Sequence, residues 1–549
     1  MTDLNPNRSR ALWLLAVLFA VLWFGTLEYR KLVKPDEGRY GEIPREMVAS
    51  GDWLTPRLNG IKYFEKPPLQ YWATAAGYTV FGEHHWTVRL WPALTGFFGI
   101  LFTGFVTMRL FGAAAGWVAA GVLGGSLLYA MLGHVAVLDM SLSVFLASAI
   151  FAFVMAQRDA ASPRETRNWM WAAYALLALA VLTKGLVGLV LPAATLVAYT
   201  LWQRDWGLWK KLHLVSGLAI FFAIAAPWFV AVSLANPEFF NFFFIHEHFQ
   251  RFLTKVHRRY APMWYFVPIL LVGLMPWTLA MFGGLWRAVK ADPTSRFQPA
   301  RFLLAWCVVV FGFFSVSSSK LVPYILPIFP ALAALIGIWW MRASPAVLKW
   351  QALFWAPVGL LIVTMAPFMV VFGDEQMPVA MFNAWVPWMI AAGVALAAGA
   401  VIAFWLARTS RPLAAALALG LGGHVALQAG FLGMDSIAPA TSTWHITQKI
   451  KPDLTPDMPF FSVGMYDQTI PFYLKRTVQM VEHTDELKHG IAWEPQKFIP
   501  TFAEFTVAWN AAPGAMAMMP PDVYKRLLAQ NLPMREIARD TRRVFVVKP

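Results

Sequence analysis

Long apolar runs follow one another through most of the chain, from residue 11 to about residue 431. Most of these runs approach or exceed the roughly 20 residues that a helix needs to cross the hydrocarbon core of a bilayer. The chain is 58% hydrophobic and only 14% charged, whereas a soluble domain usually carries about 25% charged residues. These features exclude a soluble globular fold and predict an α-helical polytopic membrane protein.

We expect about 13 membrane spans, because about that many apolar runs have a suitable length. The first run, Ala11–Leu27, follows a short segment that contains two arginines. No small-x-small cleavage site follows it and many spans come later, so it is interpreted as a transmembrane helix rather than a signal peptide. The predicted spans are 11–28, 86–108, 111–131, 135–156, 169–183, 186–202, 213–234, 263–286, 302–318, 321–341, 351–372, 382–406 and 412–431.

Positive charge alternates between the two sides of the predicted bundle. The connections that follow even-numbered spans are basic, and they carry Arg109, Arg158, Arg164, Arg167, Arg204, Lys210, Lys211, Arg287, Lys290, Arg296, Arg301, Arg342, Lys349, Arg408 and Arg411. The short connections on the other side, 133–134, 183–185 and 373–387, have few charges. Because basic loops stay in the cytoplasm, the N-terminus is predicted to be cytoplasmic. An odd number of spans then places the C-terminus outside.

Two outward loops, 28–85 and 236–262, are long and rich in ionisable and aromatic residues. Such loops on a rigid scaffold are where functional residues gather. The tail has a different composition, with short β-like runs at 459–463, 477–481, 505–509 and 543–547 and a helical candidate at 520–530. The predicted organisation is therefore a transmembrane domain, 1–434, followed by a soluble α/β domain, 435–549, on the outer side.

The net charge of +15 is explained by the basic cytoplasmic loops and by contact with anionic membrane lipids, so no nucleic-acid partner is expected. The single cysteine, Cys307, lies in an apolar run, which excludes a disulfide framework. The chain has neither a P-loop nor a dinucleotide-binding glycine motif. An enzyme acting outside would lack cytosolic nucleotide sugars, and a lipid-linked donor would fit.

The first outward loop begins with a cluster of ionisable residues in the sequence Lys34-Pro-Asp-Glu-Gly-Arg-Tyr40. Asp36 and Glu37 follow the membrane exit by a few residues, with Arg39 and Tyr40 beside them. This arrangement is suited to catalysis on the outer face. The alternative is a solvated turn, because charges collect at membrane exits in any case.

The same loop continues with Tyr63-Phe-Glu-Lys-Pro-Pro-Leu-Gln-Tyr-Trp72. The tandem prolines disfavour helix just before them, so Glu65 and Lys66 are expected in extended backbone ahead of a helix. A lysine held at that position can bind a phosphate as a point charge. The alternative is an ordinary lysine at the membrane interface.

Three further residues are predicted to carry charge toward the outer face. Asp139 lies near the outward start of an apolar run, where a carboxylate is costly and so a functional candidate; its alternative roles are a helix cap or an inter-helix salt bridge. Lys184 and Lys320 lie in outward turns. Together with Arg251 they could form a basic cavity for phosphate oxygens.

The second loop contains Phe244-Ile-His-Glu-His-Phe-Gln-Arg251. A histidine pair beside a glutamate could bind zinc, but residues i and i+2 do not share a helix face. A zinc site would then combine one histidine with a ligand elsewhere, such as Glu65. The alternative is an amphipathic helix at the membrane interface.

Taken together, Asp36-Glu-Gly-Arg-Tyr40, Glu65-Lys-Pro-Pro-Leu69 with Tyr71-Trp72, and Leu138-Asp139 resemble the membrane glycosyltransferases of the GT-C class. The stretch from Glu42 to Gly60 narrows the resemblance to the bacterial 4-amino-4-deoxy-L-arabinose lipid A transferase (ArnT) family. That family implies 13 spans, an outer C-terminal domain, an undecaprenyl phosphate donor carrying aminoarabinose and a lipid A phosphate as acceptor. The product would mask negative charge and give resistance to polymyxin and other cationic peptides.

The resemblance also implies roles for individual residues. Asp36 and Asp139 match essential acidic positions, and Lys66 matches the cation that holds the carrier phosphate, helped by Arg251. Glu65 and His246 match a zinc site that is structural, with no cofactor required for catalysis. The residues implied to line the cavity are Arg39, Tyr40, Tyr63, Lys184 and Tyr324. We expect a monomer in the bacterial inner membrane.

Two other functions are compatible with the sequence. One is a GT-C transferase with a different sugar or acceptor, such as a protein O-mannosyltransferase or a lipopolysaccharide core glycosyltransferase; only the Glu65–Leu69 run argues against it. The other is a lipid transporter or flippase. A transporter should show two related halves with broken helices at matching positions, and the sequence shows neither.

Overall fold

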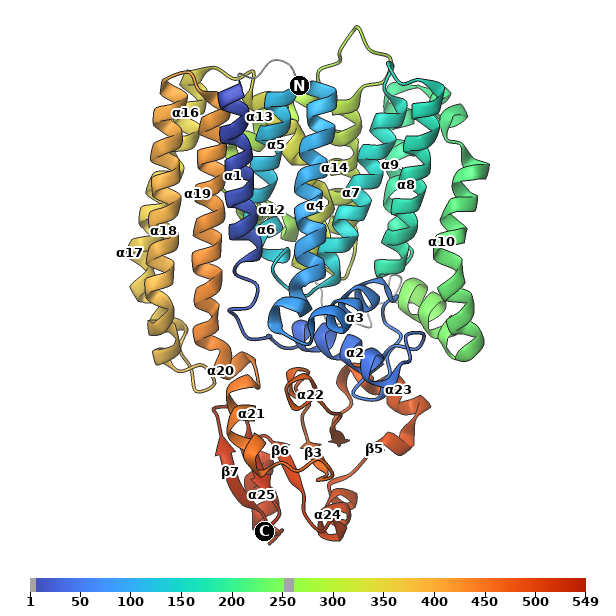
Figure 1. Cartoon of the computed structure of the whole chain (residues 1–549), viewed down its shortest axis with the longest axis vertical. Coiled ribbons are helices and arrows are strands. Elements are labelled where there is room, and N and C mark those ends of the chain that lie inside the picture. The colour runs from blue at the N-terminus through green and yellow to red at the C-terminus, as the bar shows by residue number, and fades with distance from the viewer. Residues whose placement is uncertain (1–5, 251–260) are drawn as a thin grey trace.

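The computed structural model describes residues 6–250 and 261–549, and it places a tall helical bundle above a small mixed α/β domain (Figure 1). The first helix, α1 (Pro6–Phe24), starts at the end of the bundle away from that domain. Two helices of the first long loop, α2 (Asp36–Ser50) and α3 (Leu69–Phe81), lie between the bundle and the tail. The loop is therefore enclosed between the two main parts of the molecule.

Within the described residues, eight helices are long and apolar enough to cross a membrane. A ninth span is formed if the pair Met263–Gly273 and Thr278–Val289, bent by 111°, is counted as one. Three shorter apolar helices accompany them. The multi-pass character predicted from the sequence is confirmed, whereas the number of about 13 spans stays a prediction.

The helices of the bundle occur in the order of the predicted apolar runs. They are α4 (His85–Phe111), α5 (Ala113–Gly125), α6 (Leu127–Leu132), α7 (Leu138–Gln157), α8 (Pro163–Lys184), α9 (Val187–Gln203), α10 (Leu214–Ala235), α12 (Phe266–Gly273), α13 (Thr278–Val289), α14 (Pro299–Val316), α15 (Phe329–Trp340), α16 (Pro345–Leu353), α17 (Trp355–Met365), α18 (Val379–Arg408) and α19 (Pro412–Leu432). The π-helix η2 (Asn241–Gln250) lies in the loop predicted at 236–262.

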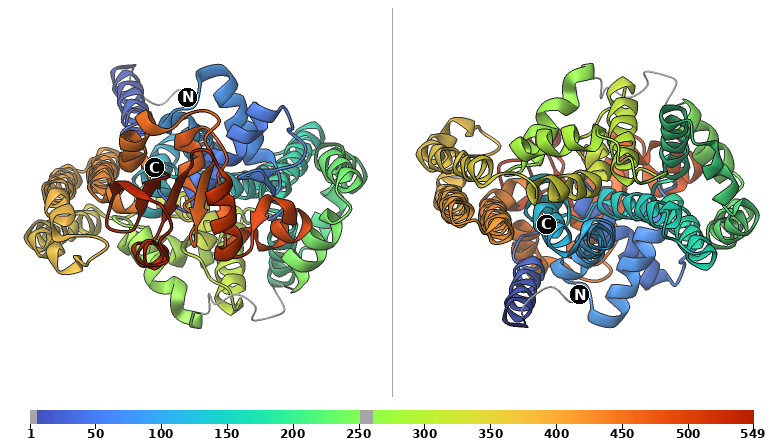
Figure 2. Two further views of the ribbon diagram at one scale, coloured as in Figure 1. Left: turned by 90° about the horizontal axis from the view of Figure 1, so that it is seen from below. Right: turned by 90° about the horizontal axis from the view of Figure 1, so that it is seen from above.

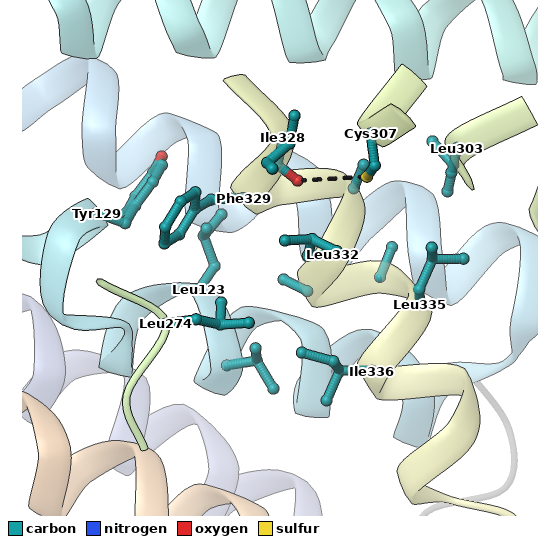
Figure 3. Packing of buried hydrophobic residues seen from close by; sticks show 14 of the residues in the cluster. Leu123, Tyr129, Leu274, Leu303, Cys307, Ile328, Phe329, Leu332, Leu335 and Ile336 are labelled. Atoms are coloured by element: carbon teal, nitrogen blue, oxygen red, sulfur yellow. Dashed lines mark hydrogen bonds between the residues drawn. The ribbon is translucent and has the colours of Figure 1, made fainter. Parts of the chain in front are cut away.

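The core of the bundle is apolar and tightly packed around α5, α14 and α15. Figure 3 shows Leu123 and Phe329 beside Leu332 and Leu335, with the Cys307 thiol facing the Ile328 carbonyl at 3.9 Å. Close approach of α15 to α5 needs glycine, because a Cβ on Gly337 would lie 2.6 Å from the Ala115 carbonyl oxygen. Viewed along the bundle axis, α10 and α17 lie at opposite edges (Figure 2).

The tail contains a six-stranded sheet with strand order β5-β4-β3-β6-β8-β7. Strands β3, β4, β5 and β6 run parallel to one another, and β8 and β7 add an antiparallel edge beside β6. The strands are β3 (Phe460–Val463), β4 (Gln479–Val481), β5 (Phe498–Ile499), β6 (Met516–Met519), β7 (Arg535–Arg539) and β8 (Val544–Val547). Every residue of β3, β6 and β8 is buried, as expected when a sheet is covered on both faces.

Shorter helices connect and cover the strands of the tail. They are α20 (Ala438–Thr441), α21 (Trp444–Ile450), α22 (Thr469–Leu474), α23 (Lys488–Trp493), α24 (Phe502–Ala511) and α25 (Pro521–Ala529). In the first loop, β1 (Arg57–Leu58) and β2 (Ile61–Lys62) form a small antiparallel hairpin. The predicted strands near 460, 480 and 545 and the helix near 525 agree with the structure.

The predicted strand at 505–509 is wrong, since these residues lie in helix α24. The Thr501 hydroxyl accepts a hydrogen bond from the Glu504 amide at 3.2 Å, which caps the helix start. Phe505 and Trp509, four residues apart, are both fully buried on one helix face. The aromatic residues that suggested a strand are the apolar stripe of a helix.

Candidate active site

Asp36 is the first residue of α2 and stands at the edge of the candidate site. Its side chain is about half exposed, at 49%, and it accepts a hydrogen bond from Arg39 Nη1 at 3.2 Å. The Arg39 guanidinium also lies over the rings of Tyr40 and Tyr63, at 5.7 and 5.9 Å from their centroids. The Asp36–Arg39 pair therefore lies beside two buried phenol rings, those of Tyr40 and Tyr63.

Glu37, the neighbour of Asp36, is fully buried and faces the bundle. It accepts hydrogen bonds from Arg89 Nε at 2.7 Å and Arg89 Nη2 at 2.8 Å. Burial alone would raise the pKa of Glu37, but the Arg89 guanidinium outweighs it and lowers that pKa to about 2. Glu37 is therefore ionised at neutral pH and serves as an anchor for α2.

The same carboxylate ties together segments that are distant in the sequence. Glu37 also accepts from the backbone amides of Val33, at 3.1 Å, and Ala136, at 3.2 Å. Ala136 lies three residues before Asp139. The segments that carry Asp36 and Asp139 are therefore joined through one buried ion pair.

Asp139 lies in the first turn of α7 and forms an ion pair with Lys184, the last residue of α8, at 2.5 Å. Both side chains are about one-sixth exposed, at 16% and 17%. The Lys184 ammonium also lies 4.9 Å from the centroid of the Tyr324 ring. The structure thus brings together three of the residues predicted from the sequence.

Lys66 precedes the tandem prolines and α3, as the sequence predicts. Its ammonium group donates to the Glu65 carbonyl at 2.8 Å and lies 3.7 Å from the Glu65 carboxylate. Only 14% of the Lys66 side chain is exposed, which distinguishes it from an interfacial lysine that extends into water.

Several charged groups of the site influence the Tyr40 phenol. Burial raises the pKa of the Tyr40 phenol, and the charges of Arg39, Asp36, Glu65 and Asp139 all act on it. Burial also raises the pKa of Tyr63. Both phenols are neutral at physiological pH and act as hydrogen-bonding groups rather than charges.

The tail domain closes over this region. Glu486 forms an ion pair with Arg39 and accepts a hydrogen bond from Gln468 Nε2 at 2.7 Å. A Cβ on Gly38 would lie 2.5 Å from the Gln468 carbonyl carbon, so only glycine allows α2 to approach this closely. Sequence reasoning missed Glu486 and Gln468, because nothing nearby in the sequence links them to the first loop.

Two further residues predicted from the sequence make contacts of their own. The His246 ring, on η2, packs 4.8 Å from the His489 ring and 5.4 Å from the Phe242 ring, measured between centroids. The Lys320 ammonium donates to the carbonyls of Ala261 and Ser317, at 2.9 and 2.5 Å. Arg251 lies outside the described residues.

A protein-bound metal normally takes three or four side-chain ligands. In the part of the chain that the structure describes, no group of three or more His, Cys, Asp and Glu side chains could hold a metal ion. The described residues therefore do not form a complete zinc site around Glu65 and His246, and the structural zinc stays a prediction.

Comparison with known proteins agrees with this geometry. Residues 446–548 match a family model described as the aminoarabinose transferase C-terminal domain. Residues 9–243 match one described as dolichyl-phosphate-mannose-protein mannosyltransferase. The two matches cover the tail and the first half of the bundle with its first long loop.

Whole-chain relatives extend these matches. The chain is 32% identical over 522 residues, 90% of each protein, to the undecaprenyl phosphate-alpha-4-amino-4-deoxy-L-arabinose arabinosyl transferase of Edwardsiella ictaluri. The chain is also 33% identical over 371 residues to the protein of the same name from Erwinia tasmaniensis. That alignment spans 66%, just under two thirds, of the relative's length. The crystal structure of ArnT from Cupriavidus metallidurans bound to undecaprenyl phosphate superposes with a TM-score of 0.94, at 40% identity and 98% coverage of both chains.

Three observations indicate the same family: the fold, the acidic and basic residues of the first loop, and these relatives. The chain belongs to the ArnT family of membrane-embedded GT-C glycosyltransferases.

Proposed function

We propose that this protein transfers 4-amino-4-deoxy-L-arabinose from undecaprenyl phosphate to a phosphate group of lipid A. The observation that carries the proposal is the match, over 98% of the chain, to an ArnT crystallised with undecaprenyl phosphate. The Asp139–Lys184 ion pair and the enclosed Lys66 beside Glu65 support it.

We propose that transfer takes place on the periplasmic side of the inner membrane, and the charge pattern supports this orientation. Basic loops are expected in the cytoplasm, and the start of α1 lies at the end of the bundle opposite the tail (Figure 1). The tail and the candidate site would then face the periplasm, where lipid-linked donors are exposed. The protein would act as a monomer, and its product would confer resistance to cationic peptides.

The residues of the site would act on two groups, the leaving carrier phosphate and the attacking acceptor phosphate. Departure of undecaprenyl phosphate leaves negative charge on its phosphate, and Lys66, helped by Arg251, would stabilise that charge as it builds. The acceptor phosphate has a second pKa of about 6, so it is largely ionised at neutral pH and needs no strong base. Asp36 would orient the acceptor or the sugar amine, and no step requires a metal.

A single in-line displacement has a stereochemical consequence. We expect the anomeric configuration of the transferred sugar to invert, because the acceptor oxygen attacks opposite the leaving phosphate. The measurement is NMR of the product formed by the purified protein in liposomes from a donor of known configuration. Retention would rule out the single displacement and indicate a covalent intermediate or a different mechanism.

The match of residues 9–243 to protein mannosyltransferases favours a second candidate, in which the same scaffold uses a different donor or acceptor. The match of residues 446–548 to the aminoarabinose transferase tail argues for the first. Supplying the purified protein with dolichyl- or undecaprenyl-linked mannose and a peptide acceptor separates the two: mannosylated peptide would favour the second candidate.

A further inference from the structure

One face of α3 carries three polar side chains that are fully enclosed. Gln70, Tyr71 and Thr74 are exposed by no more than 1%. Their spacing, i, i+1 and i+4, places them on neighbouring parts of the helix surface. Gln70 Nε2, the Tyr71 hydroxyl and the Thr74 hydroxyl have no hydrogen-bond partner among the described residues.

Buried polar groups are nearly always paired, because leaving one unpaired costs free energy of folding. Three such groups on two turns of one helix are therefore unexpected in a purely structural segment. Tyr78, further along the same helix, shows the ordinary arrangement: it is also buried, and its hydroxyl donates to the Gly41 carbonyl at 3.0 Å.

Two of the three side chains contact the acidic segments of the candidate site. The Tyr71 ring stacks on the Tyr40 ring, with 6.1 Å between centroids. The Gln70 amide oxygen accepts from the Ser141 hydroxyl at 3.3 Å, two residues beyond Asp139. The Tyr63 hydroxyl, on a ring that lies 5.9 Å from the Arg39 guanidinium, is also buried without a partner among the described residues.

The chemistry of these groups favours a ligand with hydrogen-bonding groups over a phosphate or a polyprenyl chain. An amide, a phenol and an alcohol are neutral, and each can form directed hydrogen bonds. A phosphate would call for cations, which here are Lys66 and Lys184, and a polyprenyl chain would call for apolar walls. Burial raises the pKa of Tyr71, so its hydroxyl stays protonated.

We propose that Gln70, Tyr71 and Thr74 bind the hydroxyl and amine groups of the sugar that is being transferred. This inference rests on the proposed function and extends it by naming the residues that select the sugar. The free energy lost by burying these groups in the free protein is regained when the sugar pairs with them.

The test compares Tyr71→Phe with the matched variant Tyr78→Phe, each removing one buried hydroxyl from α3. Full-length proteins are assayed in liposomes with the lipid-linked aminoarabinose donor, and their thermal unfolding is measured separately. For Tyr71→Phe we expect unchanged or higher thermal stability and a kcat/KM for the donor lowered at least about 10-fold. For Tyr78→Phe we expect lower stability, with kcat/KM within about 2-fold of the parent.

Full activity of Tyr71→Phe beside an active parent would overturn the inference. So would a loss of stability in Tyr71→Phe as large as that in Tyr78→Phe, since the hydroxyl would then be paired inside the fold. An inactive parent would instead contradict the proposed function, which keeps the two failures apart.

Donor analogues that each lack one hydroxyl or the amine provide a second readout. The parent should discriminate against every analogue that removes a contacted group, and Tyr71→Phe should lose discrimination against one of them. Equal discrimination by both proteins across the whole set would show that Tyr71 does not contact the sugar.

Discussion

Replacing Lys66 with alanine is expected to lower kcat/KM for transfer by at least about 10²-fold and to leave the protein folded. The lysine is held before two prolines and is largely enclosed, with its ammonium group 3.7 Å from the Glu65 carboxylate. It is thus placed to act on charge that develops on the carrier phosphate. Transfer would be measured in liposomes over a range of donor concentrations.

Lys62→Ala is the matched control for this experiment. Lys62 lies in the same loop, and its ammonium pairs with Glu238 at 2.6 Å. This variant should keep most of its activity, since a partly exposed ion pair contributes little to stability. Full activity of Lys66→Ala, or equal losses in both variants, would remove Lys66 from the mechanism.

Arg89→Leu is expected to destabilise the protein by about 3–5 kcal/mol. The substitution leaves the Glu37 carboxylate buried and uncompensated, and it removes the donors to the carbonyls of Leu27 and Arg30, at 2.8 and 2.7 Å. Activity should fall as well, because Glu37 joins the segments of Asp36 and Asp139. The measurement is thermal or denaturant unfolding in detergent, beside a transfer assay.

Two comparisons separate burial from charge in this prediction. Arg539→Ala breaks an exposed ion pair with Glu536, with contacts of 2.6 and 2.9 Å, and should cost no more than about 1 kcal/mol. Adding Glu37→Leu to Arg89→Leu should recover part of the lost stability, because no unpaired charge remains in the interior. Equal costs for Arg89→Leu and Arg539→Ala would contradict this account.

Much of the bundle could be predicted from the sequence, because lipid requires long apolar helices and their composition is distinctive. The breaks within helices could not. The run predicted as one span at 263–286 bends by 111° between α12 and α13, and the run at 111–131 divides into α5 and α6. Such bends depend on packing against neighbouring helices, which local composition does not record.

The short segments of the candidate site could also be predicted, since Asp36 and Asp139 are charged residues near predicted membrane spans and Lys66 precedes a pair of prolines. Their partners were harder to find. Arg89 could have been suspected, because an arginine within an apolar run needs a partner. Nothing in the sequence around Glu486 indicates a role in the site, because its ion pair with Arg39 forms only when the tail packs on the first loop.

The tail shows the opposite difficulty, because its short elements give weak local signals. Strand β6, at the centre of the sheet, has the sequence Met-Ala-Met-Met and lacks the β-branched residues that favour strands. It was missed, and Phe505–Trp509 was assigned to a strand for its aromatic residues. In both segments, the pattern of burial in the folded domain decides the structure over local preference.

The central claim is tested most directly by mass spectrometry of lipid A from a polymyxin-sensitive strain that lacks its own transferase and expresses this chain. The proposed function predicts that lipid A gains the mass of one or more aminoarabinose groups, and that the gain disappears with Asp36→Ala at equal protein abundance. Unchanged lipid A in cells that contain abundant folded protein and the lipid-linked donor would contradict it.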